Sequence, residues 1–496
     1  MEITFGMDFF GAKEGRKTPV KMVSSRLING HVLIVGSSGV GKSYTIRRMI
    51  EQAAATGKRI RFHVFDVHGD LEIKGASVVQ FSEQAPFGLN PFRVNPSVEF
   101  GGVRKAIQAF IRTVDQASRT PLGLKQEAVI RELALDVYRE FGFLQNDPST
   151  WSLNGFDSRL VSGGGDNRIY LDVPFADKDR ARAAGARWSP EQKLWFVHTQ
   201  HYKGAVTEFR PAYKARTYPT VADVLAYAKQ IHLEKFLGSD QKALRALATV
   251  NKTARVMQRR MLDSVKRKRN DEVVYDEDAE MSLEDARQRA IEAYSDYVNA
   301  VQTGLELENF TKYESPEVLK SVVDRLGNLN ATGIFKDSPA PFDESNPVWR
   351  YKLNALSLEE KKMLVLFLLQ DLFYKAVQRG EQSDVVEVAI LDELGTYTSS
   401  QDERGDGIIG TIAREARKFG LALWAANQSP ENVPDSLISS VGTKIVLGLD
   451  EMYWKEAVSK LRMDTKLLSF IQPHHTMAVQ LKEKGALKTR WWWTQI

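Results

Sequence analysis

Continuous apolar runs near both ends of the chain predict the strands of a buried sheet. The runs at 31–35, 385–391 and 421–426 hardly alternate with polar residues, a pattern typical of parallel strands covered on both faces. A further strand is predicted at 60–65, where Arg61 and His63 interrupt the apolar residues. Helical spacing follows the first run from residue 44 onward. Two shorter strand-like segments, at 3–7 and 19–22, precede it. We therefore predict an α/β fold built on a doubly wound parallel sheet.

The middle of the chain has a different pattern, because its apolar positions recur mostly at helical spacing. It predicts a helical insertion in two parts, 99–160 and 213–380. The insertion would separate an N-terminal part of the core (1–98) from a C-terminal part (381–496). Within it, the glycine-rich stretch 162–166 predicts a flexible joint. The strand-like and helix-like segments that follow predict a small α+β module at 166–212.

Two segments of the insertion have compositions that suit nucleic acid, and each has a plainer interpretation. In the module, Trp188 and Trp195 could stack on the bases of a single strand, or they could form the core of a tiny domain. A basic block at 255–269 runs into an acidic block at 271–280. It could contact nucleic acid, or it could be a solvated helix leading into a mobile loop, since the two blocks mostly cancel. The module's basic residues are Lys178, Arg180, Arg182, Arg187 and Lys193.

The first strand runs directly into a glycine-rich loop that predicts a phosphate site. The sequence GSSGVGKS lies between this strand and a helix, where backbone N–H groups and the helix N-terminus can surround phosphate oxygens. The lysine would neutralise the β- and γ-phosphates of ATP, and the serine after it would hold Mg²⁺. The predicted nucleotide-binding residues are Gly36, Ser37, Ser38, Gly39, Val40, Gly41, Lys42, Ser43 and the adjoining Tyr44.

Acidic residues at two later strand ends are the predicted partners of this loop. Asp392 and Glu393 follow the run at 385–391. Asp392 is placed to bind Mg²⁺ through water, and Glu393 to orient and deprotonate the attacking water. Asp66 ends the run at 60–65. Because parallel strands end at one edge of a sheet, we expect Asp66 and Asp392 to meet near the γ-phosphate.

A third motif follows the acids. The strand at 421–426 delivers the amide of Gln428 toward the γ-phosphate, where it could sense that group. The preceding helix presents Arg414 and Arg417. Either arginine could reach the nucleotide of a neighbouring subunit, or both could simply complement the helix dipole.

Composition and charge exclude several classes of protein. The 496 residues include no cysteine, which excludes disulfides, thiolate zinc sites and cysteine nucleophiles. The longest apolar run, at 363–369, is far too short to span a bilayer. The first residues lack the features of a signal peptide, so we expect a cytoplasmic protein. The net charge of +5 weakly favours a polyanionic partner.

In their order along the chain, the motifs GSSGVGKS, FDVHGD, GLNPF, AILDE, REARKFG and ANQSP resemble those of the HerA/FtsK superfamily of ring-forming motor ATPases. That family includes HerA helicases and the ATPases of conjugative type IV secretion. The resemblance implies a RecA-like core, ATP and Mg²⁺, and a homohexamer. It also implies Lys42 and Ser43 for phosphate and Mg²⁺, Asp392 for Mg²⁺ and Glu393 as base. Gln428 would be the sensor, Asp66 an auxiliary acid, and Arg417 or Arg414 the finger that acts in trans.

The module at 166–212 resembles a small domain attached to plasmid primases and transfer proteins, which favours a mobile-element setting. Neither the N-terminal β-barrel of HerA proteins nor the membrane helices of coupling proteins is evident in the sequence. We therefore expect no direct membrane insertion, and any membrane association to come from partners.

Three functions fit these features. The first is a hexameric translocase of double-stranded DNA, with the module gripping single-stranded or duplex nucleic acid. The second is a secretion ATPase that energises protein or pilus transfer without handling DNA. The third is an ATP-dependent scaffold that recruits a nuclease or relaxase.

Overall fold

The computed structural model describes residues 1–57, 59–118, 120–153, 168–190, 193–212, 217–237, 241–268, 277–300, 313, 315–398, 407–486 and 489–495. These residues form two compact units. The first comprises Met1–Pro121, Tyr138–Val221 and Leu329–Ile496, and the second comprises Leu122–Val137 and Ala222–Asn328. The joint expected at 162–166 and the start of the acidic block, 271–276, lie outside the described residues.

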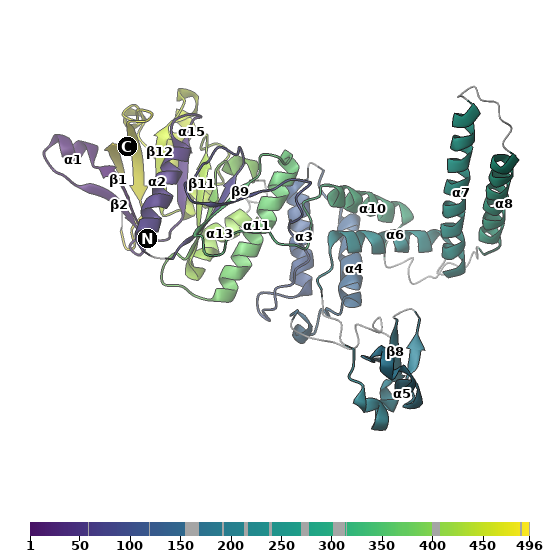
Figure 1. Ribbon diagram of the computed structural model, residues 1–496. Helices are drawn as coiled ribbons and strands as arrows, with labels where there is room; N and C mark the ends of the chain where they lie inside the picture. The colour runs from purple at the N-terminus through teal and green to yellow at the C-terminus, as the bar shows by residue number, and fades with distance from the viewer. Residues whose placement is uncertain are drawn as a thin grey trace. The chain divides into compact units, whose positions relative to one another are not determined.

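A nine-stranded sheet forms the centre of the first unit (Figure 1). Its order is β14-β13-β12-β3-β11-β10-β4-β9-β5. The seven strands from β12 to β5 are parallel, and β13 and β14 add an antiparallel edge. This arrangement confirms the predicted α/β fold. The strands are β3 (Val32–Gly36), β4 (Arg61–Asp66), β5 (Ser77–Gln80), β9 (Val348–Lys352), β10 (Glu387–Leu391), β11 (Leu421–Asn427), β12 (Thr443–Gly448), β13 (Thr476–Leu481) and β14 (Trp491–Gln495).

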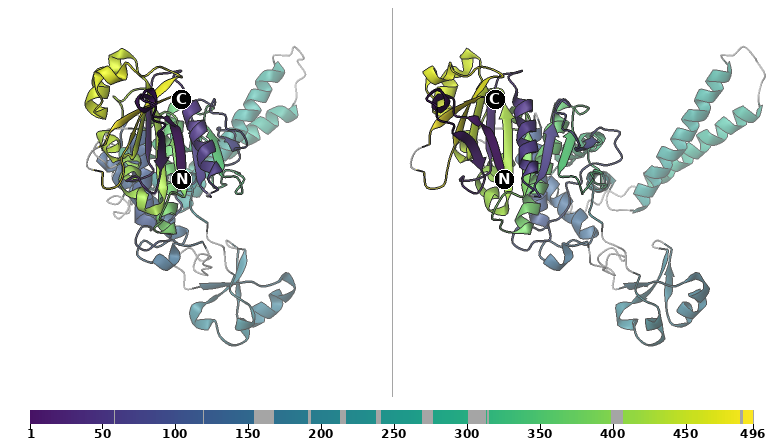
Figure 2. Two further views of the ribbon diagram at one scale, coloured as in Figure 1. Left: turned by 90° about the vertical axis from the view of Figure 1, so that its left-hand side faces the viewer. Right: turned by 60° about the vertical axis from the view of Figure 1, so that its left-hand side comes forward.

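Both faces of the sheet are covered, which explains the continuous apolar runs (Figure 2). Alternate residues of β3, β4, β10 and β11 pack into one core with α2 (Lys42–Ala55) and with the hairpin of β1 (Glu2–Met7) and β2 (Pro19–Val23). The other face of β11 contacts α13 (Ile408–Glu415), which also packs on α11 (Leu358–Arg379). Strands that are buried on both faces consist mostly of hydrophobic residues.

Strand β9 and helix α11 belong to the first unit, although the sequence assigned the range 213–380 that contains them to the helical insertion. β9 pairs in parallel with both β4 and β5, so the core resumes well before residue 381. The sequence of β9, VWRYK, contains two cations and no apolar run, which explains why the sequence pattern did not predict a core strand here. α3 (Val103–Ala117) also packs on α11, with the rings of Phe110 and Phe367 stacked 6.1 Å apart.

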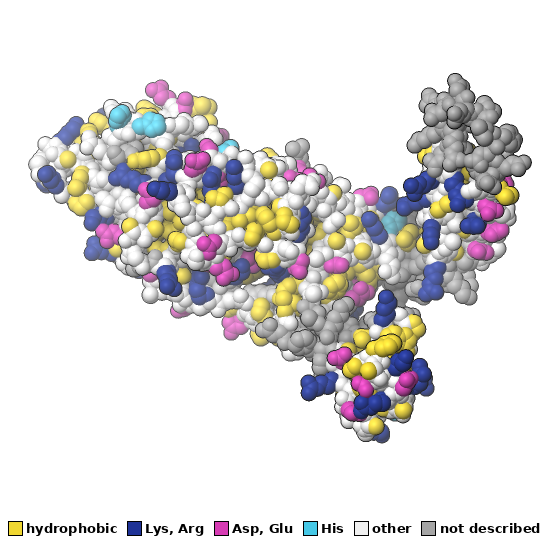
Figure 3. Space-filling view, in the orientation of Figure 1, with side chains coloured by type: hydrophobic (Ala, Val, Ile, Leu, Met, Phe, Trp, Pro, Cys, Tyr) yellow, Lys and Arg dark blue, Asp and Glu magenta, His cyan; other side chains and the backbone are white. Residues whose placement is uncertain are grey.

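Helices make up the second unit. They include most of α4 (Leu124–Glu140) and α10 (Pro316–Ala331), together with α6 (Val221–Leu237), α7 (Gln241–Lys268) and α8 (Glu277–Ala300). α7 and α8 pack side by side as a helical hairpin (Figure 1). On its surface, Lys and Arg gather over α7, whereas Asp and Glu gather over α8 (Figure 3). Of the helices described, none combines the length and apolar character needed to cross a bilayer.

The small module has its own three-stranded antiparallel sheet, in the order β6-β8-β7. β6 (Arg168–Leu171) is followed by α5 (Lys178–Ala183), β7 (Arg187–Ser189) and β8 (Leu194–His198). A compact apolar cluster that includes Leu171, Ala181 and Trp195 fills its centre. The module therefore holds together through a core of its own.

The GLNPF motif has a packing role in the first unit. The backbone N–H groups of Gly88 and Leu89 donate to the carbonyl oxygens of Ser338 (2.9 Å) and Ile334 (3.0 Å). A Cβ on Gly88 would lie 2.3 Å from the Ile334 oxygen. Only glycine lets the two backbone segments approach this closely.

We expect Gly88→Ala to destabilise the first unit by about 1–3 kcal/mol, because the added methyl group must push two hydrogen-bonded segments apart. Thermal unfolding followed by circular dichroism would measure the loss. Gly327→Ala is the matched control, since no atom lies within 4 Å of the Cβ position on this helical glycine. Equal unfolding temperatures for the Gly88 variant and the unsubstituted protein would contradict this role.

Candidate active site

The ends of four neighbouring parallel strands bring the predicted site residues, except Arg414 and Arg417, to one edge of the sheet. In the strand register, Leu391 lies beside both Phe65 and Ala425, and Asn427 lies beside Val35. Asp392 therefore emerges next to Asp66, and the phosphate loop next to Gln428. The ligand crevice of an open α/β sheet is expected at this edge.

The phosphate loop joins β3 to α2 through glycines that no other residue could replace without strain. Gly39 and Gly41 have φ values of 77° and 102°, in the region that favours glycine. A Cβ on Gly36 would lie 2.7 Å from the side chain of Val40. The loop therefore keeps its backbone N–H groups close to the N-terminus of α2, an arrangement suited to phosphate.

Lys42 lies within this loop. Its ammonium donates to the carbonyl oxygens of Gly36 (2.8 Å) and Ser37 (3.0 Å). Burial lowers the pKa of Lys42, while the nearby carboxylates of Glu393 and Asp392 act in the opposite direction. Lys42 therefore lies close enough to both acids to interact with them electrostatically. Ser43 is half-buried behind it, and Tyr44 is exposed.

Three carboxylates converge beside the loop. Oxygen atoms of Asp66, Asp70 and Asp392 all lie within 4.8 Å of one another, in the part of the chain that the structure describes. Burial, together with the charges of Asp66 and Asp70, raises the pKa of Asp392 to about 6, while His68 acts in the opposite direction. Crowded carboxylate oxygens are the donors that a hard divalent cation prefers, so the residues present fit Mg²⁺.

Asp66 has a partner that the sequence did not suggest. The guanidinium of Arg350 on β9 donates to one Asp66 oxygen at 2.8 and 2.6 Å. The backbone N–H groups of Gly69 and Leu71 donate to the same carboxylate at 2.7 and 3.3 Å. Both side chains of the pair are buried. The structure thus brings Asp66 to the site, but in an ion pair that also joins β4 to β9.

Glu393 and Gln428 meet as the strand ends predicted. The Gln428 amide donates to the Glu393 carboxylate at 3.3 Å. One residue earlier, the Asn427 amide oxygen accepts from the N–H of Gly395 at 2.9 Å. The end of β11 is therefore linked twice to the loop that carries Glu393. A displacement of Gln428 would therefore also shift Glu393.

Two further residues at the site gave no signal in the sequence. The hydroxyl of Tyr397 is buried and has no hydrogen-bond partner among the residues that the structure describes, and burial together with the charges of Asp392 and Asp66 raises its pKa. His474 has a φ of 64°, and its Nδ1 lies 3.6 Å from where a Cβ on Gly41 would be. The imidazole therefore lies beside the phosphate loop.

Arg414 and Arg417 lie at the opposite end of the sheet from the phosphate loop. Arg417 helps to lower the pKa of His31, at the start of β3, although burial is the main cause of the shift to about 4. Both arginines are exposed and line a cavity of about 450 Å³. With β3 spanning about 17 Å, neither is placed to contact the nucleotide of its own subunit.

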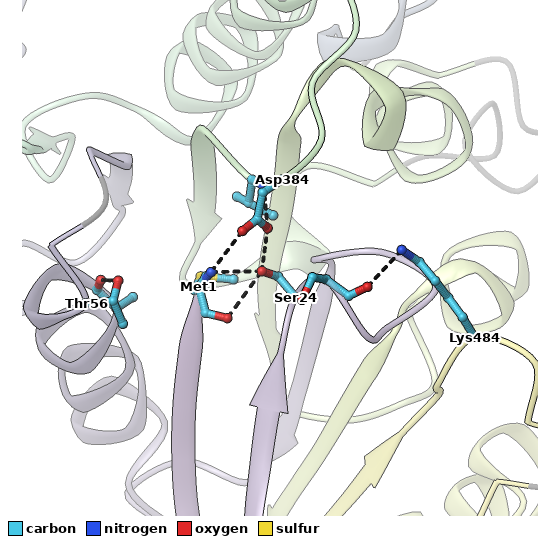
Figure 4. Close-up of polar contacts among 8 residues, drawn as sticks. Met1, Ser24, Thr56, Asp384 and Lys484 are labelled. Carbon is cyan, nitrogen blue, oxygen red and sulfur yellow. Dashed lines mark hydrogen bonds and ion pairs between the residues drawn. The ribbon is translucent and has the colours of Figure 1, made fainter.

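The same cavity is bordered by a polar network around the first residue (Figure 4). The amino group of Met1 donates to the Ser24 hydroxyl at 2.9 Å and lies 3.2 Å from the Asp384 carboxylate. Ser24 also donates to Asp384, and Lys484 donates to the carbonyl oxygen of Ser25 at 2.9 Å. These contacts tie the N-terminal hairpin to the segment that leads into β10.

The two tryptophans of the small module have different environments. Trp195 is 8% exposed and belongs to the module's core, so the second of the two interpretations, a role in the core, applies to it. Trp188 is 48% exposed and meets Trp195 edge to face at 5.7 Å. The guanidinium of Arg182 lies 5.6 Å from the Trp195 ring. Of the two, only Trp188 offers an accessible ring.

We expect Asp392→Asn to stabilise the nucleotide-free, metal-free protein at pH 8. A carboxyl whose pKa is raised on folding costs stability when ionised. This loss of stability is complete above pH 6, and it disappears as the pH falls below 3.8, the ordinary pKa of an aspartate. The gain at pH 8 should be about 2–3 kcal/mol, and it should shrink toward zero near pH 4. Thermal unfolding in a chelator at both pH values would measure it.

Asp296→Asn, on the exposed face of α8, is the control and should change little at either pH. An Asp392→Asn protein that is no more stable at pH 8 than the unsubstituted chain would contradict the carboxylate crowding.

Comparisons with known proteins agree with this geometry. Residues 9–137 match the family model "Helicase HerA, central domain", and residues 168–211 match a domain of unknown function, DUF5710. The DNA double-strand break repair helicase HerA of Pyrococcus furiosus is 32% identical over 83 residues. That match covers 16% of this chain and 15% of the helicase, so this chain aligns with only a small part of that relative.

Solved structures extend the likeness of the fold. VirB4 of Thermoanaerobacter pseudethanolicus superposes with a TM-score of 0.55 at 13% identity, covering 98% of this chain and 96% of VirB4. The plasmid coupling protein TrwB, solved with ADP and Mg²⁺, gives 0.42 at 11% identity, covering 94% of this chain and 85% of TrwB. The matches to HerA and the similarity in fold to VirB4, together with the motifs at the sheet edge, support the expected relationship to the HerA/FtsK-type P-loop motor ATPases.

Proposed function

We propose that this protein is a ring-forming ATPase that couples ATP hydrolysis to the translocation of double-stranded DNA. The observation that carries the proposal is the hydrogen bond between Gln428 and Glu393, beside Lys42 and Asp392. This arrangement joins a phosphate-binding loop, a metal-binding carboxylate, a general base and a sensing amide at one edge of the sheet. The HerA relative is named as a DNA helicase, which supports DNA as the load.

In the proposed reaction, the backbone N–H groups at the start of α2 and the ammonium of Lys42 bind the β- and γ-phosphates of ATP. Ser43 and Asp392 would hold Mg²⁺, which supplies positive charge against the phosphate oxygens. Glu393 orients a water molecule and accepts its proton as the water oxygen attacks the γ-phosphorus. The bond to the β-phosphate oxygen breaks, so ADP and inorganic phosphate leave. Gln428 holds Glu393 in place and can respond to the loss of the γ-phosphate.

The position of the arginines supports assembly into a ring. Arg414 and Arg417 lie far from their own phosphate loop and are exposed. In the proposed homohexamer, one of them reaches the nucleotide of the neighbouring subunit and stabilises the charge that develops during transfer. The exposed Trp188 gives the small module a ring on which a single-stranded base could stack. We place the protein in the cytoplasm, with any membrane association through partners.

The secretion ATPase is the second candidate, and the likeness to VirB4 over 98% of this chain favours it. It would use the same nucleotide site without a DNA load. The scaffold that recruits a nuclease or relaxase is less well supported, because a scaffold has no need of a base held by a sensing amide.

We expect linear duplex DNA to stimulate steady-state ATP hydrolysis several-fold in low salt, and Glu393→Gln to lower kcat by at least about 100-fold with DNA present. Glu51→Gln, on the exposed face of α2, is the matched control and should retain both basal and stimulated rates. The stimulation should weaken steeply as salt rises, because phosphate contacts release counterions.

A rate that is abolished in the Glu393 variant but unaffected by DNA would favour the secretion ATPase. Hydrolysis that survives Glu393→Gln would contradict the proposed catalytic role of this site.

A further inference from the structure

One face of α7 carries a row of cations. Between residues 245 and 262, where the side chains of this helix are described, there are five cations and no acid. Figure 3 shows these side chains as a basic surface over α7. The charged residues of this segment are Arg245, Lys252, Arg255, Arg259 and Arg260.

Four of these residues form a stripe along the helix. At about 100° per residue, Arg245, Lys252 and Arg259 fall within an arc of about 40°, and Arg255 lies about 40° further round. The stripe is about 21 Å long, since fourteen steps of about 1.5 Å each separate Arg245 from Arg259. Arg260 is not part of it, because its guanidinium turns to the carbonyl oxygen of Ser282 on α8.

The stripe faces away from α8. The half-buried apolar side chains of α7, Leu247, Val250 and Met257, lie on the opposite side of the helix from the stripe. On α8, Ala286 and Ala293 are buried. The contact between the two helices therefore uses the apolar face of α7 and leaves the basic face to solvent.

The cations of the stripe lack the acidic partners that those of α8 possess. On α8, Arg287 pairs with Glu284 at 2.9 Å and Arg289 with Asp285 at 3.5 Å. Among the described residues, no acid lies within ion-pair distance of Arg245, Lys252, Arg255 or Arg259. Like charges at helical spacing of three and four residues repel one another. A bound polyanion would relieve this repulsion.

We propose that the α7 stripe binds the phosphate backbone of DNA, as a contact separate from the nucleotide-binding core. The proposal rests on the proposed function, because it names a surface that holds the DNA on which the motor acts. A straight row of cations suits a linear polyanion. Binding at a lipid surface would need an apolar face of α7 as well, and Leu247, Val250 and Met257 of that face are half-buried on the side that packs on α8. Duplex and single-stranded DNA both present backbone phosphates to the stripe.

The test compares two double variants of the full chain that remove equal charge. Lys252→Gln with Arg259→Gln removes two stripe cations, and Arg287→Gln with Arg289→Gln removes the two paired cations of α8. Fluorescence anisotropy would measure binding to a labelled 30-base-pair duplex and a 30-nucleotide single strand, at several salt concentrations. Circular dichroism and the ATP hydrolysis rate without DNA would verify that each variant is folded.

The stripe variant should bind at least one of the two DNAs about tenfold more weakly in low salt, and its salt dependence should fall by about two counterions. The DNA that loses more affinity identifies the form that the stripe holds. The α8 variant should stay within about twofold of the unsubstituted protein for both.

Equal DNA affinities for the stripe variant and the unsubstituted protein would overturn the proposal while leaving the proposed function intact. An unsubstituted protein that hydrolyses ATP but binds neither DNA would overturn both. Stripe-dependent binding to phosphatidylserine vesicles without DNA binding would also overturn both, and would assign the stripe to a lipid surface.

Discussion

The concentration of negative charge at one edge of the parallel sheet is the constraint on which the rest of the structure depends. Parallel strands must end together, so the acids at the ends of β4 and β10 share one space. The Arg350–Asp66 ion pair compensates one of these charges from β9. The other, on Asp392, is left in an environment that raises its pKa to about 6. A site of this kind favours a divalent cation and the lysine of the phosphate loop.

The same constraint explains why we assign the nucleotide site to the nine-stranded sheet and the nucleic-acid contacts to elements outside it. The nucleotide machinery needs rigid strand ends, and all of its residues come from the first unit. The surfaces that we assign to nucleic acid, the α7 stripe and Trp188, lie on elements outside the nine-stranded sheet. The α7 stripe needs exposed cations and Trp188 needs an exposed ring, and neither requires a buried strand end.

The sequence predicted the parts of the site that depend on local patterns. Residues 36–43 were recognisable because the loop, strand and helix are consecutive. The convergence of Asp66 and Asp392 followed from the rule that parallel strands end at one edge. Arg350 could not be predicted, because it lies 284 residues from Asp66 along the chain and in a strand without an apolar run. The position of His474 depends on a left-handed backbone that no periodicity reveals.

The most direct test of this account measures ATP turnover per subunit across protein concentration, together with mass in the presence of ATP. If an arginine from a neighbouring subunit completes each site, turnover per subunit should be low when the protein is dilute. It should rise and level off as a species with the mass of a hexamer forms. A constant turnover per subunit from a protein that stays monomeric would contradict the account.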